Sequence, residues 1–252
     1  MRVLSAMDVR WVWVFIDSVR PAGPAWEFWR AVTDSTLSPT RGDRGQFATL
    51  LPPQSNPWIK VQEVDAGGGV HLDFDVINVN VAADYATLLG ARELHRFPEG
   101  TTIVMASPGG FVFCLTTWDG VPRANRTDSP AERLDQVALD VPPEGYAVET
   151  AFWADLLGVT AETGSRPEFT VLTLPGPLPI RLLLQRLDDP GSCTRVTGHV
   201  DIACADRAAS RARHLELGAA HVGDGPRWSV LRAPGGAAHC LTDRDPGTGR
   251  LP

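Results

Sequence analysis

Alternating apolar and polar residues predict a strand close to the beginning of the chain. The segment 11–17, WVWVFID, places its aromatic residues on one face of an extended strand, because side chains alternate between the two faces of a sheet. After a turn containing Pro and Gly, the apolar residues of 25–32, AWEFWRAV, recur at helical spacing. The alternating segments 46–52 and 58–64 then predict two further strands.

The same order of patterns returns in the next part of the chain. Residues 70–76 predict a strand and 81–91 a helix, and the segments 102–106 and 111–116 predict strands after it. We interpret each of these two units as a strand, a helix and three strands. Together they make up the first half of the chain, residues 8–120.

The second half repeats this order of elements. Its strands are expected at 134–141, 168–175, 180–187, 199–205, 227–233 and 237–243, and its helices at 148–157 and 207–219. Six short sequence motifs recur in the same order, 122 to 128 residues further along the chain. One example is SPGGFVFCLTT at 107–117, which returns as APGGAAHCLTD at 233–243. Such a period predicts an internal duplication. We expect one domain at 8–120, a second at 133–245, and a polar linker at 119–132.

Composition and charge exclude several classes of partner. The chain has 252 residues, a formal net charge of −7 and no apolar run long enough for a membrane span, so we expect neither nucleic-acid nor membrane binding. The four cysteines, at 114, 193, 204 and 240, form no CxxC pair, which favours free thiols in a cytoplasmic protein. We expect a monomer or a weak homodimer.

These motifs and their order resemble those of the vicinal oxygen chelate (VOC) superfamily, which includes glyoxalase I, extradiol dioxygenases and bleomycin-resistance proteins. The residues that carry the resemblance are Phe28-Trp29, Gln62, His71-Leu72-Asp73, Leu89-Gly90-Ala91 and 107–115, with their partners Phe152-Trp153, Gln185, His199-Val200-Asp201, Leu217-Gly218-Ala219 and 233–241. The resemblance implies an α+β fold of two tandem glyoxalase-like domains. Each domain would consist of two βαβββ units that form a cup-shaped mixed sheet around a small-molecule cavity.

The resemblance also implies where a metal would be bound. The four ligand positions of each cup fall on Trp13, Gln62, His71 and Cys114 in the first half, and on Gln136, Gln185, His199 and Cys240 in the second. Each half keeps one histidine and no carboxylate there, and the neutral carbonyl of glutamine is a weak ligand. We therefore expect no cofactor, with a divalent metal as the less favoured alternative, and a small-molecule-binding protein with a drug- or metabolite-binding or resistance role.

Two His–Asp pairs are the remaining candidates for chemistry. His71 and Asp73, and likewise His199 and Asp201, lie two residues apart on one strand face, where a carboxylate can orient an imidazole for catalysis. The alternative interpretation is a satisfied buried hydrogen bond. The residues expected to contact a ligand are Trp13, Gln62, Cys114, Gln136, Gln185, Cys240 and Trp58, although the cysteines and tryptophans also fit an ordinary core.

A second function stays open at this point. The chain would then be a VOC enzyme, a lyase, isomerase or dioxygenase, that uses His71 or His199 in one of the two cups, with or without a divalent metal.

Overall fold

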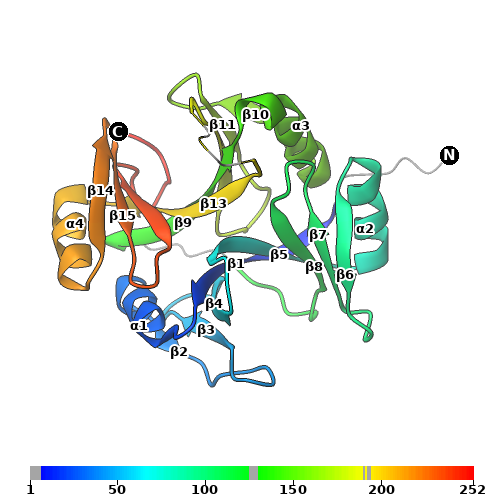
Figure 1. Ribbon diagram of the computed structural model, residues 1–252, viewed down its shortest axis with the longest axis horizontal. Coiled ribbons are helices and arrows are strands. Elements are labelled where there is room, and N and C mark those ends of the chain that lie inside the picture. The colour runs from blue at the N-terminus through cyan, green and yellow to red at the C-terminus, as the bar shows by residue number, and fades with distance from the viewer. Residues whose placement is uncertain (1–6, 125–129, 190, 192–193) are drawn as a thin grey trace. The chain divides into compact units, whose positions relative to one another are not determined.

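The computed structural model describes residues 7–124, 130–189, 191 and 194–252, and its elements can be followed from blue to red in Figure 1. The first half contains β1 (Val9–Val19), α1 (Gly23–Val32), β2 (Thr36–Leu37), β3 (Phe47–Leu51), β4 (Ile59–Val64), β5 (Gly69–Val76), α2 (Val79–Leu88), β6 (Arg92–Arg96), β7 (Thr102–Ala106) and β8 (Val112–Thr117). The second half contains β9 (Glu132–Val141), the 3-10 helix η1 (Pro143–Gly145), α3 (Tyr146–Leu157), β10 (Ala161–Thr163), β11 (Phe169–Leu172), β12 (Arg181–Arg186), β13 (Thr197–Cys204), α4 (Arg207–Glu216), β14 (Ala220–Gly225), β15 (Trp228–Arg232) and β16 (Ala238–Thr242).

Two eight-stranded sheets repeat one topology. Their strand orders are β2-β3-β4-β1-β5-β8-β7-β6 and β10-β11-β12-β9-β13-β16-β15-β14. Parallel pairs such as β5 with β8 and β13 with β16 stand beside antiparallel pairs such as β7 with β8, so both sheets are mixed. The expected α+β class and the internal duplication are confirmed. The structure adds β2, β6, β10 and β14, which the sequence pattern did not locate.

The repeated Pro-Gly-Gly motifs each form a hydrogen-bonded turn, although Gly235 has a φ of +89° and the equivalent Gly109 has no positive φ. Gly110 has a φ of +88° and Gly236 a φ of +96°, values that a residue with a side chain rarely adopts. The amide of Gly110 donates to the carbonyl of Ser107 at 2.9 Å, and that of Gly236 to the carbonyl of Ala233 at 2.9 Å. Each turn leads into the strand that carries the repeated cysteine, β8 or β16.

Helices α2 and α4 begin at equivalent capping residues. The side chain of Asn78 accepts hydrogen bonds from the amides of Asn80 and Val81, and that of Asp206 accepts one from Ala209. Such caps satisfy amides that have no partner within the helix. None of the helices in the described ranges is long and apolar enough to cross a membrane.

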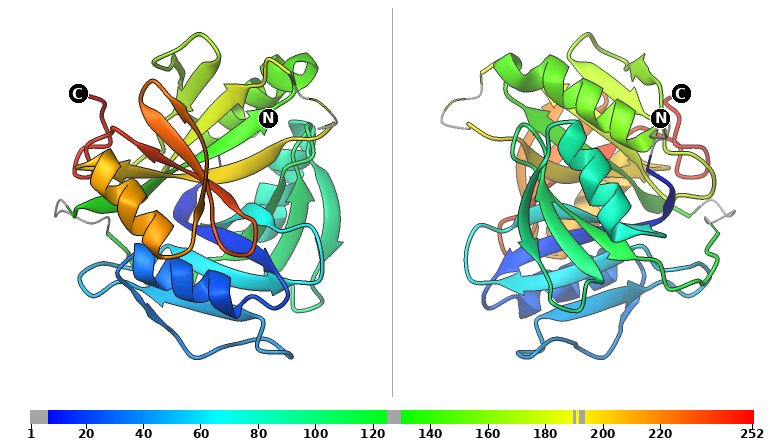
Figure 2. Two further views of the ribbon diagram at one scale, coloured as in Figure 1. Left: turned by 60° about the vertical axis from the view of Figure 1, so that its left-hand side comes forward. Right: turned by 90° about the vertical axis from the view of Figure 1, so that its right-hand side faces the viewer.

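The chain forms two compact units, and each combines parts of both halves. The first unit consists of the residues up to Trp13, His71–Arg123 and Ala138–Gly198. The second consists of Val14–Val70, Ala124–Val137 and His199–Pro252. The helices α2 and α3 of the first unit and α1 and α4 of the second can be traced in Figure 2.

Aromatic side chains form the core of the first unit. The ring of Trp153 on α3 lies 5.2 Å from that of Phe113 on β8 and 6.1 Å from that of Phe74 on β5, measured between centroids. Phe152 also packs on Phe113, at 6.1 Å. Edge-on and tilted contacts at these distances add to the free energy of burying the rings. Helix α3 is therefore fixed on β5 and β8, the two strands that carry the first His–Asp pair and Cys114.

The second unit replaces part of this aromatic core with histidines. Phe28 and Trp29 on α1, which correspond to Phe152 and Trp153, pack on His214 and His239 at centroid distances of 5.6 and 5.3 Å. In the repeated Pro-Gly-Gly motif, His239 occupies the position that Phe113 has in the first half. The duplication thus preserved the packing position while changing the chemistry of the side chain.

A buried glutamate links α3 to the Pro-Gly-Gly turn of the first unit. Glu149 accepts hydrogen bonds from Trp153 Nε1 at 2.8 Å and from the amide of Gly109 at 2.8 Å. The second unit has Ala25 at the equivalent position, and Trp29 Nε1 is buried there with no hydrogen-bond partner among the described residues. Glu149 is therefore a stabilising contact that only one unit possesses.

Replacing Glu149 by Ala is expected to lower the free energy of unfolding by about 1–3 kcal/mol, because two buried donors lose their acceptor. Urea unfolding measures this change. The matched control is Glu144→Ala on the neighbouring exposed η1, where a change within about 0.5 kcal/mol is expected. Equal effects of the two substitutions would contradict the assignment.

Candidate functional site

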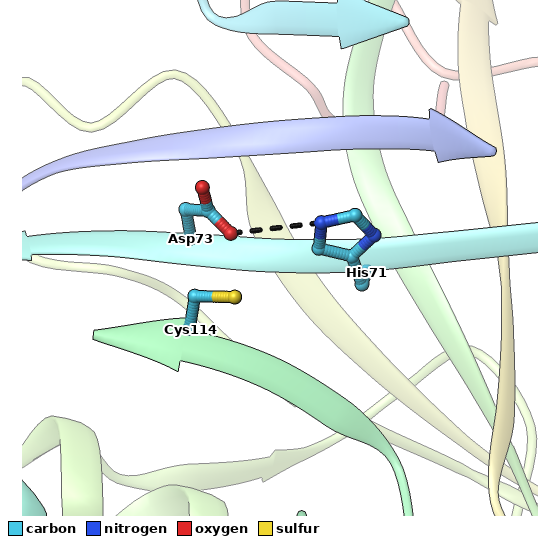
Figure 3. Close-up of side chains that lie close together, drawn as sticks. All are labelled: His71, Asp73 and Cys114. Atoms are coloured by element: carbon cyan, nitrogen blue, oxygen red, sulfur yellow. Dashed lines mark ion pairs between the residues drawn. The ribbon is translucent and has the colours of Figure 1, made fainter. Parts of the chain in front are cut away.

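Three side chains with metal-binding atoms meet on β5 and β8; we call His71, Asp73 and Cys114 the first-half site. Asp73 lies directly opposite Cys114 in the parallel register, and His71 precedes Asp73 by two residues on the same strand face. One ligand atom from each side chain lies within 4.8 Å of the other two. Figure 3 shows the His71 imidazole and the Asp73 carboxylate turned toward one another, with Cys114 on the neighbouring strand.

The duplicated strands β13 and β16 build the same arrangement; we call His199, Asp201 and Cys240 the second-half site. Asp201 lies opposite Cys240, and the three ligand atoms again fall within 4.8 Å of one another. Each site therefore combines an imidazole nitrogen, a carboxylate oxygen and a thiol sulfur. Both sites are mostly shielded from solvent, and both aspartates are buried.

The donor geometry fits a divalent cation. His71 Nε2 lies 3.7 Å from Asp73 Oδ1, and His199 Nε2 lies 3.4 Å from Asp201 Oδ1. Two donors bound to one tetrahedral zinc ion are about 3.3 Å apart, given metal–ligand bonds of about 2.0 Å. Both of these Oδ1 atoms are buried and have no hydrogen-bond partner in the part of the chain that the structure describes. A buried carboxylate oxygen is costly unless it is paired or coordinates a metal.

Asp201 is held in place by polar groups on its other oxygen. Gln136 Nε2 donates a hydrogen bond to Asp201 Oδ2, and Arg244 Nη1 lies 3.7 Å from the same atom. Arg244 also forms a buried ion pair with Asp135. Burial by itself raises the pKa of Asp201, but His199, Arg244 and Gln136 together outweigh it, so that the pKa lies below its usual value. The second-half site thus holds its carboxylate ionised and oriented.

The first half carries a further polar position next to its site. Asp75 follows Asp73 by two residues on the same face of β5 and lies opposite Thr116 on β8. It accepts hydrogen bonds from Trp13 Nε1 at 3.0 Å and from Thr116 Oγ1 at 2.7 Å. The sequence analysis missed Asp75 and Thr116, although the alternating pattern of HLDFDV contains the signal for Asp75.

Three further residues were predicted to contact a ligand: Gln62 on β4, Gln185 on β12, and Trp58. Gln62 on β4 pairs with Phe47 in the antiparallel register, and it belongs to the second unit. Gln185 on β12 pairs with Phe169 and belongs to the first. Trp58 lines a pocket in the second unit together with Arg133, whose guanidinium carbon lies 6.0 Å from the Trp58 ring centroid. Trp58 therefore does line a pocket, in the unit that does not contain the first-half site.

A second buried polar cluster lies on the opposite face of β16 from Cys240. His239 Nε2 is 3.0 Å from His214 Nδ1, and His214 Nε2 is 2.9 Å from Glu132 Oε2. Burial lowers the pKa of His239 to about 3, with the nearby His214 as the next cause, so that His239 is neutral at physiological pH. Sequence reasoning assigned no chemistry to His214, and the structure places it in a fully buried network.

Cys114, Cys204 and Cys240 form no disulfide bond in the part of the chain that the structure describes. Burial raises the pKa of Cys204 to about 12, so this thiol stays protonated near neutral pH. Cys193 lies outside the described residues. The two site cysteines differ from Cys204 because each faces a histidine and an aspartate.

Solved structures share this fold at low sequence identity. A Mn(II)-bound glyoxalase from Novosphingobium aromaticivorans matches with a TM-score of 0.62 and 16% identity, over 98% of this chain and 87% of that one. An extradiol ring-cleaving dioxygenase from B. fuscum matches with a TM-score of 0.60 and 15% identity, over 99% and 76%. A mutant 4-hydroxymandelate synthase from Streptomyces coelicolor matches with a TM-score of 0.58 and 14% identity, over 97% and 95%. No curated protein sequence gives a significant match.

The expectation that the protein uses no cofactor is wrong. Both halves bring a histidine, an aspartate and a cysteine together, with their ligand atoms within 4.8 Å of one another, and such a group can hold a metal ion. The expectation failed because it counted only four positions in each half. Those positions leave out Asp73 and Asp201, whose carboxylates reach the same point from two residues beyond the histidine.

The family model described as "Glyoxalase-like domain" matches the chain twice, at residues 13–116 and 136–242. These two matches cover most of the sequence and coincide with the two eight-stranded sheets. The chain therefore belongs to the glyoxalase-like domain family, as a tandem pair of such domains.

Proposed function

We propose that the protein is a metal-dependent VOC-type enzyme that acts on a small molecule, with a divalent ion held by His71, Asp73 and Cys114. The second-half site is the equivalent position for a second ion. The observation that carries the proposal is the buried Asp73 Oδ1, which lacks a hydrogen-bond partner among the described residues and faces an imidazole nitrogen and a thiol sulfur. A nitrogen, oxygen and sulfur donor set suits zinc or another thiol-binding divalent ion.

The roles of the three side chains follow from their chemistry. His71 supplies a neutral imidazole nitrogen, Asp73 a carboxylate and Cys114 a thiolate, so that two negative charges balance the ion. Three protein ligands leave a coordination position open for a ligand. When bound, a divalent ion polarises an oxygen of the substrate. Helix α3, through Trp153, keeps β5 and β8 in the register that this arrangement requires.

The proposal extends to a reaction class and a compartment. Proteins with a similar fold include a glyoxalase and a ring-cleaving dioxygenase, which supports a lyase, isomerase or dioxygenase reaction on a small oxygenated compound. Oxygen uptake with catechols would distinguish a dioxygenase from the other two. Cys114, Cys204 and Cys240 form no disulfide bond among the described residues, which supports a reducing compartment such as the cytoplasm.

Purified untagged protein is expected to retain zinc or another divalent metal after dialysis. His71→Ala and Asp73→Asn are each expected to remove about one equivalent per chain, because a pair of remaining donors holds the ion poorly. Inductively coupled plasma mass spectrometry measures the metal content, and the melting temperature should rise on reloading.

The matched control for this experiment is His95→Ala, which removes an exposed histidine of β6 that stacks on Phe97. It should leave the metal content unchanged. Protein that holds no metal above background after incubation with zinc, manganese and iron(II) would overturn the proposal. If His199→Ala loses metal and His71→Ala does not, the ion is bound at the second-half site instead of the first-half site.

Metal should also protect the Cys114 thiol. Without metal, iodoacetamide is expected to modify Cys114, and saturating zinc should slow this reaction at least tenfold because the thiolate becomes a ligand. Peptide mass spectrometry separates the cysteines. Cys204 serves as the internal control, since its pKa of about 12 should keep it unreactive at pH 8 with or without zinc. Equal rates for Cys114 in both conditions would exclude sulfur ligation.

A further inference from the structure

Arg123 is packed against two tryptophans of β1. Its guanidinium carbon lies 5.2 Å from the ring centroid of Trp13 and 6.0 Å from that of Trp11, and only 11% of its side chain is exposed. The two rings meet edge to face at 6.5 Å. A guanidinium over aromatic rings is attracted by their electron-rich faces while its donors stay available in its own plane. Nothing in the local sequence pattern identifies this arginine, because it lies in the polar segment predicted as a linker.

The acidic partners of Arg123 are of two kinds. Asp119 accepts a hydrogen bond from Arg123 Nη1 at 3.1 Å and a second bond from Nη2, but half of the Asp119 side chain is exposed to solvent. Asp75 Oδ2 is 3.9 Å from Nη1 and already accepts the hydrogen bond of Trp13. The principal partner of the shielded guanidinium is therefore a half-exposed carboxylate four residues away, which also accepts a hydrogen bond from the amide of Val121 at 2.9 Å.

The second half contains a more deeply buried arginine that serves for comparison. Arg244 follows β16, pairs with the buried Asp135 and has 5% of its side chain exposed. It also lies close to Asp201. Both carboxylates near Arg244 are buried, so displacing either of them would leave a buried charge without its partner. Asp119, in contrast, is half exposed, so water would solvate its carboxylate if another carboxylate took its place on Arg123.

Arg123 also lies next to the first-half site. Asp75, whose Oδ2 lies 3.9 Å from Arg123 Nη1, is two residues along β5 from Asp73. Two residues along a strand correspond to about 7 Å. A small molecule bound at the first-half site therefore reaches Arg123 if it carries a second polar group at about this distance.

We propose that Arg123 binds the carboxylate of a small organic acid in the first half, with Asp119 displaced into solvent. This proposal rests on the proposed function only for the end of the substrate that would bind the metal. The contact between the carboxylate and Arg123 does not depend on a metal ion. The planar guanidinium donates two parallel hydrogen bonds to a carboxylate, and its shielding by Trp11 and Trp13 strengthens them. The substrate class is therefore anionic, with the charge remote from the reacting oxygen.

Benzoate and its neutral analogue benzamide test the proposal on the full-length protein by isothermal titration calorimetry. In buffer with EDTA, benzoate is expected to bind at least tenfold more tightly than benzamide. Arg123→Gln should reduce the benzoate affinity about tenfold and leave benzamide unchanged. Asp119→Asn should increase the benzoate affinity about threefold, because the competing carboxylate is gone. This second variant keeps the Arg123 side chain and its packing, so it tests the idea even if Arg123→Gln unfolds.

The control is Arg10→Gln, which removes another arginine stacked on a tryptophan. The Arg10 guanidinium lies 5.5 Å from the Trp118 ring centroid and pairs with the exposed Asp8. Benzoate affinity should not change in this variant. Equal affinities for benzoate and benzamide, or a weaker benzoate affinity in Asp119→Asn, would overturn the proposal. Because EDTA is present, this result is independent of metal binding, and failure of the metal experiments leaves it intact.

Discussion

The parallel register between β5 and β8 is the constraint on which the first-half site depends. It sets Asp73 opposite Cys114 and Asp75 opposite Thr116, so one strand face carries two successive polar positions. A slip by one residue would turn every one of these side chains to the opposite face, where Phe74 and Phe113 now pack on Trp153. The aromatic core that fixes α3 on the sheet and the polar groups on its other face therefore specify the same register.

The duplication allows each half to serve as a comparison for the other. Glu149 bonds to Trp153 in the first unit, whereas Ala25 leaves Trp29 Nε1 without a hydrogen-bond partner in the described residues of the second. His239 occupies the position that Phe113 has in the first half. Its Nε2 atom forms a hydrogen bond with His214, which in turn bonds to Glu132. These exchanges show that positions facing the helices tolerate changes of chemistry as long as the packing is preserved. The histidine, aspartate and cysteine of the two sites are the same in both halves.

Much of the fold follows from the sequence, because the repeated alternation of apolar residues and the Pro-Gly-Gly turns occur in both halves. The site was only partly predictable. His71 and Asp73 share a strand face by simple alternation, but that alternation does not reveal that Cys114 is the residue opposite Asp73, which requires the β5–β8 register. Arg123 follows no periodic pattern and reaches Trp13 only through the folded path of the segment after β8. The domain boundaries at 8–120 and 133–245 stay a prediction.

The buried Oδ1 atoms of Asp73 and Asp201 are difficult to explain by stability alone. In the second half, Gln136 donates to Oδ2 of Asp201, and Arg244 lies near the same oxygen, so the surroundings could equally have evolved a donor for Oδ1. The first half has different neighbours, with Trp13 in place of Gln136, yet the same oxygen lacks a hydrogen-bond partner among the described residues there. A buried oxygen without a donor costs about 1–3 kcal/mol. Two unlike environments that both leave this oxygen facing an imidazole and a thiol support the proposed cation, because all three kinds of donor atom can bind one.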